Sequence, residues 1–483
     1  MGLRRKPLFL TIITLSLLAW LIMGMWHVYK PMPGGLDVAT PWVPAQEVRF
    51  LADTTYQAPD GTLVSDQRIF DAIGEMIRGA QRLLVLDMFL FNDFAGDSGA
   101  AYRPLSSELT GAIAERRHRR PAPRTLLITD PVNTVYGSLT PSHFERLRTA
   151  GVDIVFTDLE RLRDPNPIWS GLWRLCCQAL EASPDQGWLP NPLAEPPVAL
   201  ASWMRLLNVK ANHRKTIVAD LGDQWQGLVT SANPHDASSR HGNVALRFAG
   251  PAALDLLATE RSAAALSGHG DAFTAPRKGL GNATNRTDEG RLRILTEARI
   301  REAALDLIEA AGPDDRLDLA MFYLSHRGVI EALKRAAERG VPVRVLLDPN
   351  HDAFGRQKSG LPNRPVGNEL HRAGVQVRWC LTHGEQCHAK LLVLSHPDGS
   401  GKVLLGSANF TRRNLDNFNM ETDVEWQAPA GHPALTAILD YVARRWNNQD
   451  GEQHSLPFSH YADGSLWRYW RYRVMEATGL STF

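Results

Sequence analysis

Two short segments of this 483-residue chain place a lysine two positions after a histidine. His213 and Lys215 form the first pair, and His388 and Lys390 form the second. On a β-strand, side chains two positions apart point to the same side. Each segment therefore presents an imidazole beside a fixed positive charge.

A serine and an asparagine follow each pair at matched distances. Ser231 and Asn233 belong to a Ser-Ala-Asn sequence after the first pair, and Ser407 and Asn409 belong to one after the second. The two serines, like the two asparagines, are 176 positions apart. Both residue types donate neutral hydrogen bonds. If the two sets face each other, two histidines, two lysines and two asparagines surround one anion.

These groups suit the cleavage of a phosphodiester. One neutral histidine can attack phosphorus, and the other, when protonated, can donate a proton to the leaving alkoxide. The lysines and asparagines would stabilise the charge that develops on the non-bridging oxygens. Because these cations belong to the protein, we expect neither a metal nor another cofactor.

The rest of the chain is also duplicated, because five segments recur in the same order. Residues 83–91 and 317–324 have the pattern of apolar strands, and each follows an amphipathic helix. The later correspondences pair the strands ending at Asp130 and Asp348, the segments from Ala150 and Ala373, the histidine–lysine segments and the Ser-Ala-Asn segments. We predict an α/β fold with two copies of one unit and a single site between them.

The first copy contains about 48 residues that the second lacks, roughly from Asp158 to Met204. This insert is rich in proline, and its four tryptophans are Trp169, Trp173, Trp188 and Trp203. One interpretation is a covering layer whose tryptophans fill a small core. The other is a lid or an interfacial surface, because tryptophan favours the membrane boundary.

The first thirty residues do not belong to the duplicated body. A basic segment, residues 1–6, precedes an apolar run at residues 7–28 that contains no Asp, Glu, Lys or Arg. A bilayer core about 30 Å thick requires ~20 helical residues, so we predict a transmembrane signal anchor. A cleaved signal peptide is the alternative, but no convincing small-x-small cleavage site follows the run. The positive-inside rule places the N-terminus in the cytoplasm, which in a bacterium means the inner membrane with a periplasmic body.

The composition gives little support to nucleic-acid binding. Lys and Arg total 53 against 52 Asp and Glu, so no basic surface for a polyanion is indicated. Four cysteines are too few for a disulfide scaffold, and their spacing does not indicate a zinc site. Cys380 and Cys387 either pair, if the body is periplasmic, or remain free thiols. His235 and His241 are interpreted as solvated loop residues.

Together these motifs resemble the signature of the phospholipase D superfamily, a duplicated HxKxxxxD sequence followed by GSxN. The resemblance extends from about Phe50 to Trp446 and is greatest to bacterial membrane-anchored cardiolipin-synthase-like proteins. It implies two pseudo-repeated phospholipase D-like α/β/α lobes with one interfacial active site. It also implies a covalent phosphohistidine intermediate.

The resemblance also assigns roles to single residues. It implies that His213 and His388 are the nucleophile and the acid–base pair, with His213 as the nucleophile. It implies that Glu421 orients a catalytic histidine and that Asp220 is a scaffold residue of the motif. Phosphate binding is implied for Lys215, Lys390, Asn233 and Asn409, with support from Ser231 and Ser407.

Two positions depart from the superfamily pattern. Ser395 replaces the aspartate of the second motif, and Ala245 replaces the first copy's counterpart of Glu421. The motif aspartate looks more like a scaffold residue than a reactant. We therefore expect activity to survive both departures.

The expected function is a membrane-associated enzyme that transfers a phosphatidyl group from a phospholipid. Transfer to an alcohol would be a cardiolipin-synthase-like reaction, and transfer to water would be phospholipase D hydrolysis. The motifs are the same for both. A nuclease or other phosphodiesterase of the same superfamily and a catalytically impaired lipid-binding protein remain open. The anchor, the tryptophan-rich insert and the near-zero net charge favour a phospholipid and a membrane as partners over nucleic acid.

The organisation expected from these features runs from the anchor to an aromatic tail. After the anchor we expect a first lobe at 45–266, a linker at 267–290, a second lobe at 291–449 and a tail at 450–483. At helical spacing, Trp467, Trp470 and Val474 of the tail share one side, flanked by arginines. That side either docks on the body or lies at the bilayer boundary.

Overall fold

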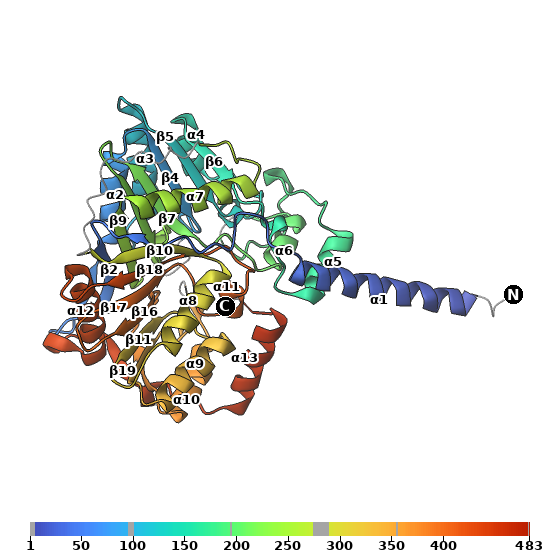
Figure 1. Cartoon of the computed structure of the whole chain (residues 1–483). Helices are drawn as coiled ribbons and strands as arrows, with labels where there is room; N and C mark the ends of the chain where they lie inside the picture. Colours follow the sequence, from blue (N-terminus) through green and yellow to red (C-terminus); the bar gives the residue numbers. More distant parts are fainter. Residues whose placement is uncertain (1–4, 95–100, 194–195, 274–288, 354–355, 482) are drawn as a thin grey trace.

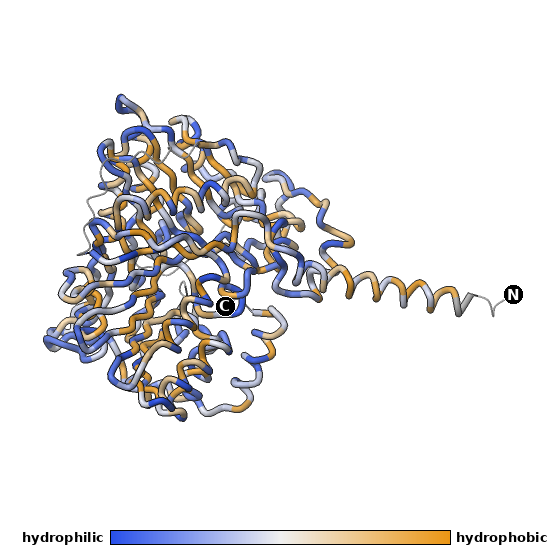
Figure 2. Tube along the Cα trace, viewed as in Figure 1, coloured by the Kyte–Doolittle hydropathy of each residue, from blue (hydrophilic) through white to orange (hydrophobic). Residues whose placement is uncertain are grey.

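The computed structural model describes residues 5–94, 101–193, 196–273, 289–353, 356–481 and 483. A long helix, α1 (Arg5–Tyr29), projects from one side of a two-part body (Figure 1). Apolar residues follow one another along this helix (Figure 2), and by length and composition its segment Leu8–Tyr29 could cross a membrane. Much of the predicted basic segment and most of the predicted linker lie outside the described residues.

Each part of the body contains one mixed β-sheet. Within the described residues, one sheet has eight strands in the order β3-β2-β9-β8-β7-β4-β5-β6, and the other has nine in the order β1-β10-β18-β17-β16-β11-β12-β15-β19. The order β2-β9-β8-β7-β4-β5-β6 thus recurs as β10-β18-β17-β16-β11-β12-β15. Strands β4, β5 and β6 are parallel, as are β11, β12 and β15. The fold therefore contains the predicted duplication, and we refer to the two parts as the first and second halves.

The strands of the first half are β2 (Arg49–Gln57), β3 (Leu63–Asp66), β4 (Leu83–Met88), β5 (Arg124–Thr129), β6 (Asp153–Phe156), β7 (Lys215–Asp220), β8 (Trp225–Thr230) and β9 (Asn243–Ala249). Those of the second half are β10 (Arg291–Thr296), β11 (Arg316–Met321), β12 (Val343–Leu347), β15 (Gln376–Cys380), β16 (Lys390–Ser395), β17 (Gly401–Gly406), β18 (Thr422–Ala428) and β19 (Ser455–Pro457). The short strand β1 (Val43–Pro44) joins the second sheet, and β13 (Asp352–Ala353) pairs separately with β14 (Arg356–Gln357).

Helices cover the outer face of each sheet, and further helices lie between the sheets. The period of two along a strand explains this layering: Leu84 and Leu86 contact the outer helices, whereas Val85 belongs to the core between the sheets. The outer helices are α2 (Ile69–Gly79), α3 (Leu105–His118) and α4 (Ser142–Thr149) in the first half, and α8 (Ala298–Glu309), α9 (Arg327–Glu338) and α10 (Asn363–Arg372) in the second. The helices of the central layer are α7 (Pro251–Leu266) and α12 (Pro433–Asn447).

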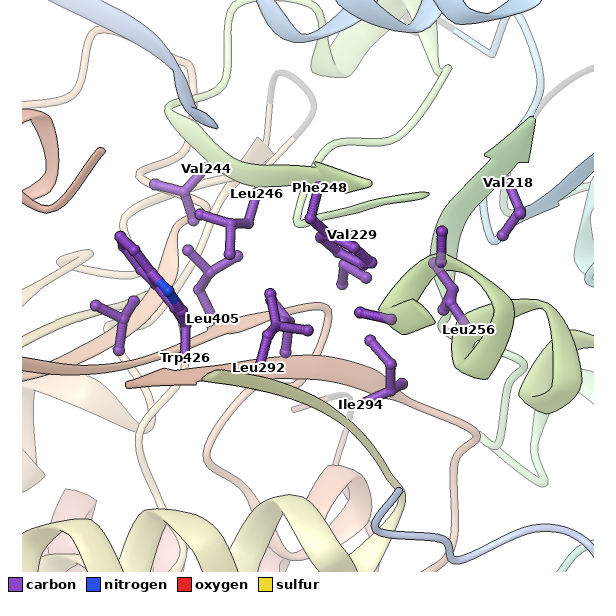
Figure 3. Packing of buried hydrophobic residues seen from close by; sticks show 14 of the residues in the cluster. Val218, Val229, Val244, Leu246, Phe248, Leu256, Leu292, Ile294, Leu405 and Trp426 are labelled. Atoms are coloured by element: carbon purple, nitrogen blue, oxygen red, sulfur yellow. The ribbon is translucent and has the colours of Figure 1, made fainter. Parts of the chain in front are cut away.

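A shared apolar core joins the two sheets. Leu246 and Phe248 of β9 lie across from Leu292 of β10, Leu405 of β17 and Trp426 of β18 (Figure 3). All five side chains are buried. Because each sheet covers the apolar inner face of the other, the core fixes the relative position of the two halves.

The insert of the first half contains α5 (Pro167–Cys176) and α6 (Leu200–Leu206). Trp173 is buried, but Trp188 is 70% exposed. Trp169 and Trp203 are half-buried, and the indole N–H of each donates to a backbone carbonyl of the insert. The expectation that the tryptophans fill a core of their own therefore holds only for Trp173.

The tail forms the predicted helix, α13 (Leu466–Thr478). Tyr472 is buried against the second half, whereas Trp467 and Trp470 are 75% and 60% exposed. Docking of the predicted aromatic face on the body is therefore wrong, because a different side of the helix makes the contact.

The cysteines form two disulfides. Cys380 pairs with Cys387, which was one of the two options left open by the sequence. Cys176 pairs with its neighbour Cys177, a pairing that the sequence did not indicate. The first disulfide ties down the residue that precedes His388.

Candidate active site

The two histidine–lysine pairs stand at the starts of β7 and β16, in the middle of each sheet. The backbone N–H of His213 donates to the carbonyl of Met420 at 2.8 Å, and that of His388 donates to Gly242 at 2.7 Å. Met420 belongs to the second half and Gly242 to the first. The opposite half therefore holds the backbone of each histidine, and both pairs lie at the junction of the halves.

A buried aspartate fixes the peptide that precedes each histidine. Asp130, after β5, accepts the backbone N–H of Asn212 at 2.7 Å, and Asp348, after β12, accepts that of Cys387 at 2.7 Å. Burial raises the pKa of Asp130 to about 7 and that of Asp348 to about 6. The sequence marks these residues only as strand ends, but the structure makes them positioning residues.

The imidazole of His213 contacts a carboxylate from the opposite half. Its Nδ1 lies 2.9 Å from Oε1 and 3.0 Å from Oε2 of Glu421. Ser407 Oγ and Asn414 Nδ2 also donate to this buried carboxylate. Because an ionised carboxylate only accepts hydrogen bonds, Nδ1 of His213 carries a proton and Nε2 is the available basic nitrogen.

Charge and burial oppose each other in this contact. Burial alone would raise the pKa of Glu421, but His213, Lys215 and Ser407 hold it below the usual value. Burial lowers the pKa of His213 to about 4, and the negative charge of Glu421 acts in the opposite direction. His213 is therefore neutral at physiological pH, as a nucleophile must be.

The imidazole of His388 has neutral acceptors instead. Its Nδ1 lies 3.0 Å from the backbone carbonyl of Ser231 and 3.1 Å from Oδ1 of Asn243, both in the first half. Burial, together with the positive charge of Lys390, takes the pKa of His388 well below its usual value. When this imidazole does bind a proton, it is consequently a strong acid.

The serines behind the two histidines occupy matching positions. Ser231 Oγ donates to Oδ1 of Asn243 at 3.0 Å, and Ser407 Oγ donates to Oε2 of Glu421. The prediction that Ala245 is the counterpart of Glu421 is wrong: Thr230 pairs with Ala245 as Gly406 pairs with Asp423, so Asn243 occupies the position of Glu421. An amide thus replaces a carboxylate behind one of the two histidines. The sequence showed Asn243 at a fixed distance from Ser231 but did not indicate this role.

The two lysines lie in equivalent surroundings. Each donates from Nζ to the carbonyl of the histidine two positions earlier, at 2.6 Å for Lys215 and 2.7 Å for Lys390. Phe89 lies 5.0 Å from the first ammonium and Phe322 lies 5.2 Å from the second. Burial lowers the pKa of Lys215 to about 7. Burial and the charge of Lys215 take that of Lys390 well below its usual value, so the two cations share one site.

Asn233 and Asn409 carry matching buried atoms. The Oδ1 atom of each is buried and has no hydrogen-bond partner among the residues that the structure describes. A buried polar group without a partner costs about 1–3 kcal/mol. An amide oxygen only accepts hydrogen bonds, so a donor would have to satisfy these two atoms, whereas the NH2 group of each amide is the part that can donate to an anion.

The final residue of each motif lies away from this site. Asp220 accepts hydrogen bonds from Arg82 Nη2 at 3.2 Å and from the N–H of Gly222 at 2.8 Å, at the far end of β7. At a strand rise of 3.3 Å per residue, about 17 Å separates Asp220 from Lys215 along β7. Ser395 ends β16 at the equivalent position. Its substitution for aspartate therefore lies far from the reacting groups.

The extra histidines are not solvated, contrary to the expectation from the sequence. His235 and His241 are both buried. The ring of His241 lies 5.8 Å from the ring of His388, and its charge contributes to the lowered pKa of His388. No group of three or more His, Cys, Asp or Glu side chains in the described part of the chain could hold a metal ion.

A cavity of about 270 Å³ lies next to the segment that leads into β7. Tyr136, Arg205 and Lys210 are among its lining residues. Thr157, which also lines it, accepts a hydrogen bond from the side chain of Asn212, the residue before His213. The cavity therefore lies beside the segment that precedes the first histidine–lysine pair, and neither histidine nor lysine of the two pairs is among its lining residues.

Comparison with known proteins gives one family match and several similar solved structures. A family described as "Cardiolipin synthase, PLD-like domain" matches residues 304–446. No curated protein sequence gives a significant match. The crystal structure of phosphatidylserine synthase from Haemophilus influenzae Rd KW20 aligns with 92% of this chain and 98% of its own, at 11% identity and a TM-score of 0.56. Its whole fold is thus similar to that of this chain.

Two further solved structures are similar over smaller shares. Nuc from Salmonella typhimurium, a phospholipase D family member, aligns with 34% of this chain and 97% of its own, at 21% identity and a TM-score of 0.27. Polyphosphate kinase from Porphyromonas gingivalis aligns with 89% of this chain at 15% identity and a TM-score of 0.45. This chain spans 53% of the length of that kinase.

Proposed function

We propose that this chain is a member of the phospholipase D superfamily and that it transfers a phosphatidyl group from a phospholipid through a phosphohistidine intermediate. The observation that carries the proposal is the duplicated set of buried groups at the junction of the halves. Two imidazoles, two buried lysines and two buried asparagines, whose NH2 groups can donate hydrogen bonds, suit a phosphodiester monoanion. The acceptor in the second step is an alcohol in a cardiolipin-synthase-like reaction, or water in a phospholipase D reaction.

In the first step, Nε2 of His213 attacks phosphorus and the bond from phosphorus to the headgroup oxygen breaks. His388 donates a proton to the departing alkoxide, which leaves as an alcohol. The phosphorylated imidazole of His213 is a cation while Nδ1 keeps its proton, and the adjacent carboxylate of Glu421 stabilises it. This pairing supports His213, rather than His388, as the nucleophile.

In the second step, His388 acts as the base. It removes the proton from the incoming alcohol or water, whose oxygen attacks phosphorus while the bond to His213 breaks. Lys215, Lys390 and the amides of Asn233 and Asn409 hold the non-bridging oxygens in both steps.

The proposed setting is the inner membrane of a bacterium, with α1 as a single span and the body on the periplasmic side. The charge difference across α1 and the two disulfides support this orientation, since disulfides persist in oxidising compartments. A protease added outside intact spheroplasts should digest the body and leave a short anchored stub. Protection of the body until lysis would reverse the orientation.

Reconstitution of the full chain into liposomes tests the proposed reaction. Phosphatidylglycerol vesicles, with or without an added alcohol, should yield a new phospholipid or phosphatidic acid, and a His213→Ala control should yield neither. The activity should persist in excess EDTA. Cleavage of single-stranded DNA with no turnover of any phospholipid would instead favour a nuclease.

A further inference from the structure

Exposed apolar side chains on the body are concentrated in two segments. Outside α1, large exposed apolar side chains of the described residues come from the insert and the tail, with the exceptions of Leu63 and of Leu207, which directly follows α6. Those of the insert are Ile168, Leu172, Leu175, Leu180, Trp188, Leu193 and Leu200. Those of the tail are Leu466, Trp467, Trp470, Val474 and Leu480. Such concentration marks an interaction surface, because monomeric proteins rarely leave large apolar patches in water.

Helix α5 of the insert packs directly against α1. The indole N–H of Trp20 donates to the carbonyl of Ile168 at 2.7 Å. A Cβ atom at Gly171 would lie 2.4 Å from the carbonyl oxygen of Trp20, and one at Gly24 would lie 2.2 Å from that of Pro167. The two helices therefore touch at positions where only glycine fits.

The position of this contact along α1 sets the depth of α5. The candidate span covers Leu8–Tyr29, 22 residues, which at 1.5 Å per residue is about 33 Å and matches a bilayer core of about 30 Å. Trp20 and Gly24 precede the end of the span by about 13 Å and 8 Å on the same rise. A helix that contacts both cannot lie outside the bilayer if α1 crosses it.

The apolar and polar side chains of α5 lie on different sides of the helix, as a position in the bilayer requires. Its exposed apolar residues Ile168, Leu172 and Leu175 follow helical spacing and line one face. Its polar side chains turn inward, where Ser170 Oγ donates to Asp164 at 2.5 Å and Arg174 Nε donates to the same carboxylate at 2.9 Å. Buried hydrogen bonds thus satisfy the polar groups and leave an apolar outer face, as a lipid environment requires.

Helix α13 lies on the side of the body from which α1 projects, as α5 and α6 do (Figure 1). Its end meets the start of the insert: a Cβ atom at Gly479 would lie 2.2 Å from the carbonyl oxygen of Pro165. Arg412 Nη1 donates to that same oxygen at 3.2 Å. The exposed tryptophans of α13, with Arg471 beside them, combine rings and positive charge in the way that suits lipid headgroups.

We propose that α5, α6 and α13 form a membrane-embedded face around the base of α1, and that the occupant of this face is the leaflet next to the body. The inference rests on the proposed span of α1. In this arrangement α5 lies among the acyl chains and α13 lies at the headgroups. The body is then held in one orientation, with the cavity and the histidine pairs a fixed distance above the lipid phosphates.

Photolabelling of the full chain in liposomes tests this face. A phospholipid with a diazirine in its acyl chain should label the peptide that contains residues 167–176 as well as α1, and one with the diazirine in its headgroup should label the peptide that contains residues 466–474. The peptide that contains the exposed Leu63 should remain unlabelled by both. Labelling confined to α1, or equal across the body, would overturn the proposal. This readout needs no catalysis, so it separates failure of the face from failure of the proposed reaction.

Substitution within the face adds a second readout. The double variant Trp467→Ser, Trp470→Ser should lose labelling of the tail and lower turnover of vesicle phospholipid about tenfold, because interfacial binding scales with the apolar area that enters the lipid. Cleavage of the soluble diester bis(p-nitrophenyl) phosphate and the melting temperature should not change. Leu63→Ser is the matched control and should leave all four measurements unchanged. A sharp fall in melting temperature, or equal loss on both substrates, would make the tail structural and contradict the proposal.

Discussion

The two halves of the site share a backbone plan and differ in the group behind each histidine. Glu421 stands behind His213, and Asn243 stands behind His388, each from the opposite half. The serines that hold these two groups, the lysines and the preceding aspartates are otherwise equivalent. One side-chain difference is therefore enough to separate the roles of two imidazoles in a duplicated site.

The charge behind each imidazole determines which histidine takes which role. The carboxylate of Glu421 favours a cationic His213, and phosphorylation makes this imidazole a cation. The amide of Asn243 orients His388 without that benefit, so its proton is readily lost. The arrangement also makes the halves interdependent, because neither contains the partner of its own histidine.

Removal of each imidazole should give the largest effects and separate the roles. His213→Ala should reduce turnover to the uncatalysed level on every substrate, because the covalent step is lost. His388→Ala should cost about 10²- to 10⁴-fold on a phospholipid with an alcohol leaving group, and far less on the formation step with a p-nitrophenol leaving group, which needs no proton. Burst kinetics with phosphatidyl p-nitrophenol measure that step, and equal loss in both variants would remove the distinction.

Exchange of the groups behind the histidines should give intermediate effects of unequal size. Glu421→Gln removes a charge-assisted hydrogen bond worth about 1.5–3 kcal/mol, so kcat should fall about 10- to 100-fold. Asn243→Ala removes a neutral bond of about 0.5–1.5 kcal/mol and leaves the carbonyl of Ser231 in place, so kcat should fall only about 2- to 10-fold. A larger loss for Asn243→Ala would reverse the proposed roles.

The pH profile should show the same asymmetry. His213 must be neutral to attack, so kcat/KM should fall below about pH 4. His388 must hold a proton to donate it, and its pKa lies well below the usual value, so the basic limb should begin before Lys215 loses its charge near pH 7. Because Glu421 raises the pKa of His213, Glu421→Gln should move the acid limb to lower pH. An acid limb near pH 6.5 that does not move in this variant would contradict the assignment.

Substitutions at the last residue of each motif, Asp220 and Ser395, should have the smallest effects on turnover. Asp220→Asn weakens its contacts with Arg82 and Gly222, so unfolding free energy should fall by about 1–3 kcal/mol while kcat stays unchanged. Ser395→Asp restores the missing motif residue and should not raise kcat. Thermal denaturation beside lipid turnover checks both variants, and a rise in kcat for Ser395→Asp would give the motif aspartate a part in catalysis.

Motif spacing and internal duplication predicted the two similar halves and the meeting of the paired histidines and lysines at their junction. Local patterns of this kind are readable because a strand fixes which side chains share a face. The sequence could not predict that each histidine contacts a side chain from the opposite half, because the contacts of Asn243 and Glu421 depend on how the sheets pack. The role of Asp130 and Asp348 was hidden for the same reason. The burial of His235 and His241 likewise depends on tertiary packing and not on the polar segment that contains them.

The surface of the insert and tail was only half predicted. The composition of both segments suggested that they lie at the membrane boundary. Helical spacing predicted the side of α13 that carries Trp467 and Trp470. The close contact of Gly24 and Gly171 was not predicted, because a glycine in a helical pattern does not reveal its neighbour. That contact is what links the depth of α5 to α1.

Trapping the intermediate tests the central claim most directly. Phosphatidyl p-nitrophenol should transfer its phosphatidyl group to the protein and release p-nitrophenolate, which needs no acid to leave. His388→Ala should then slow hydrolysis of the adduct because the base is missing. Mass spectrometry of quenched digests should find the phosphatidyl group on the peptide that contains His213, and on no peptide of the His213→Ala variant. An adduct on His388, or full turnover by His213→Ala, would contradict the account.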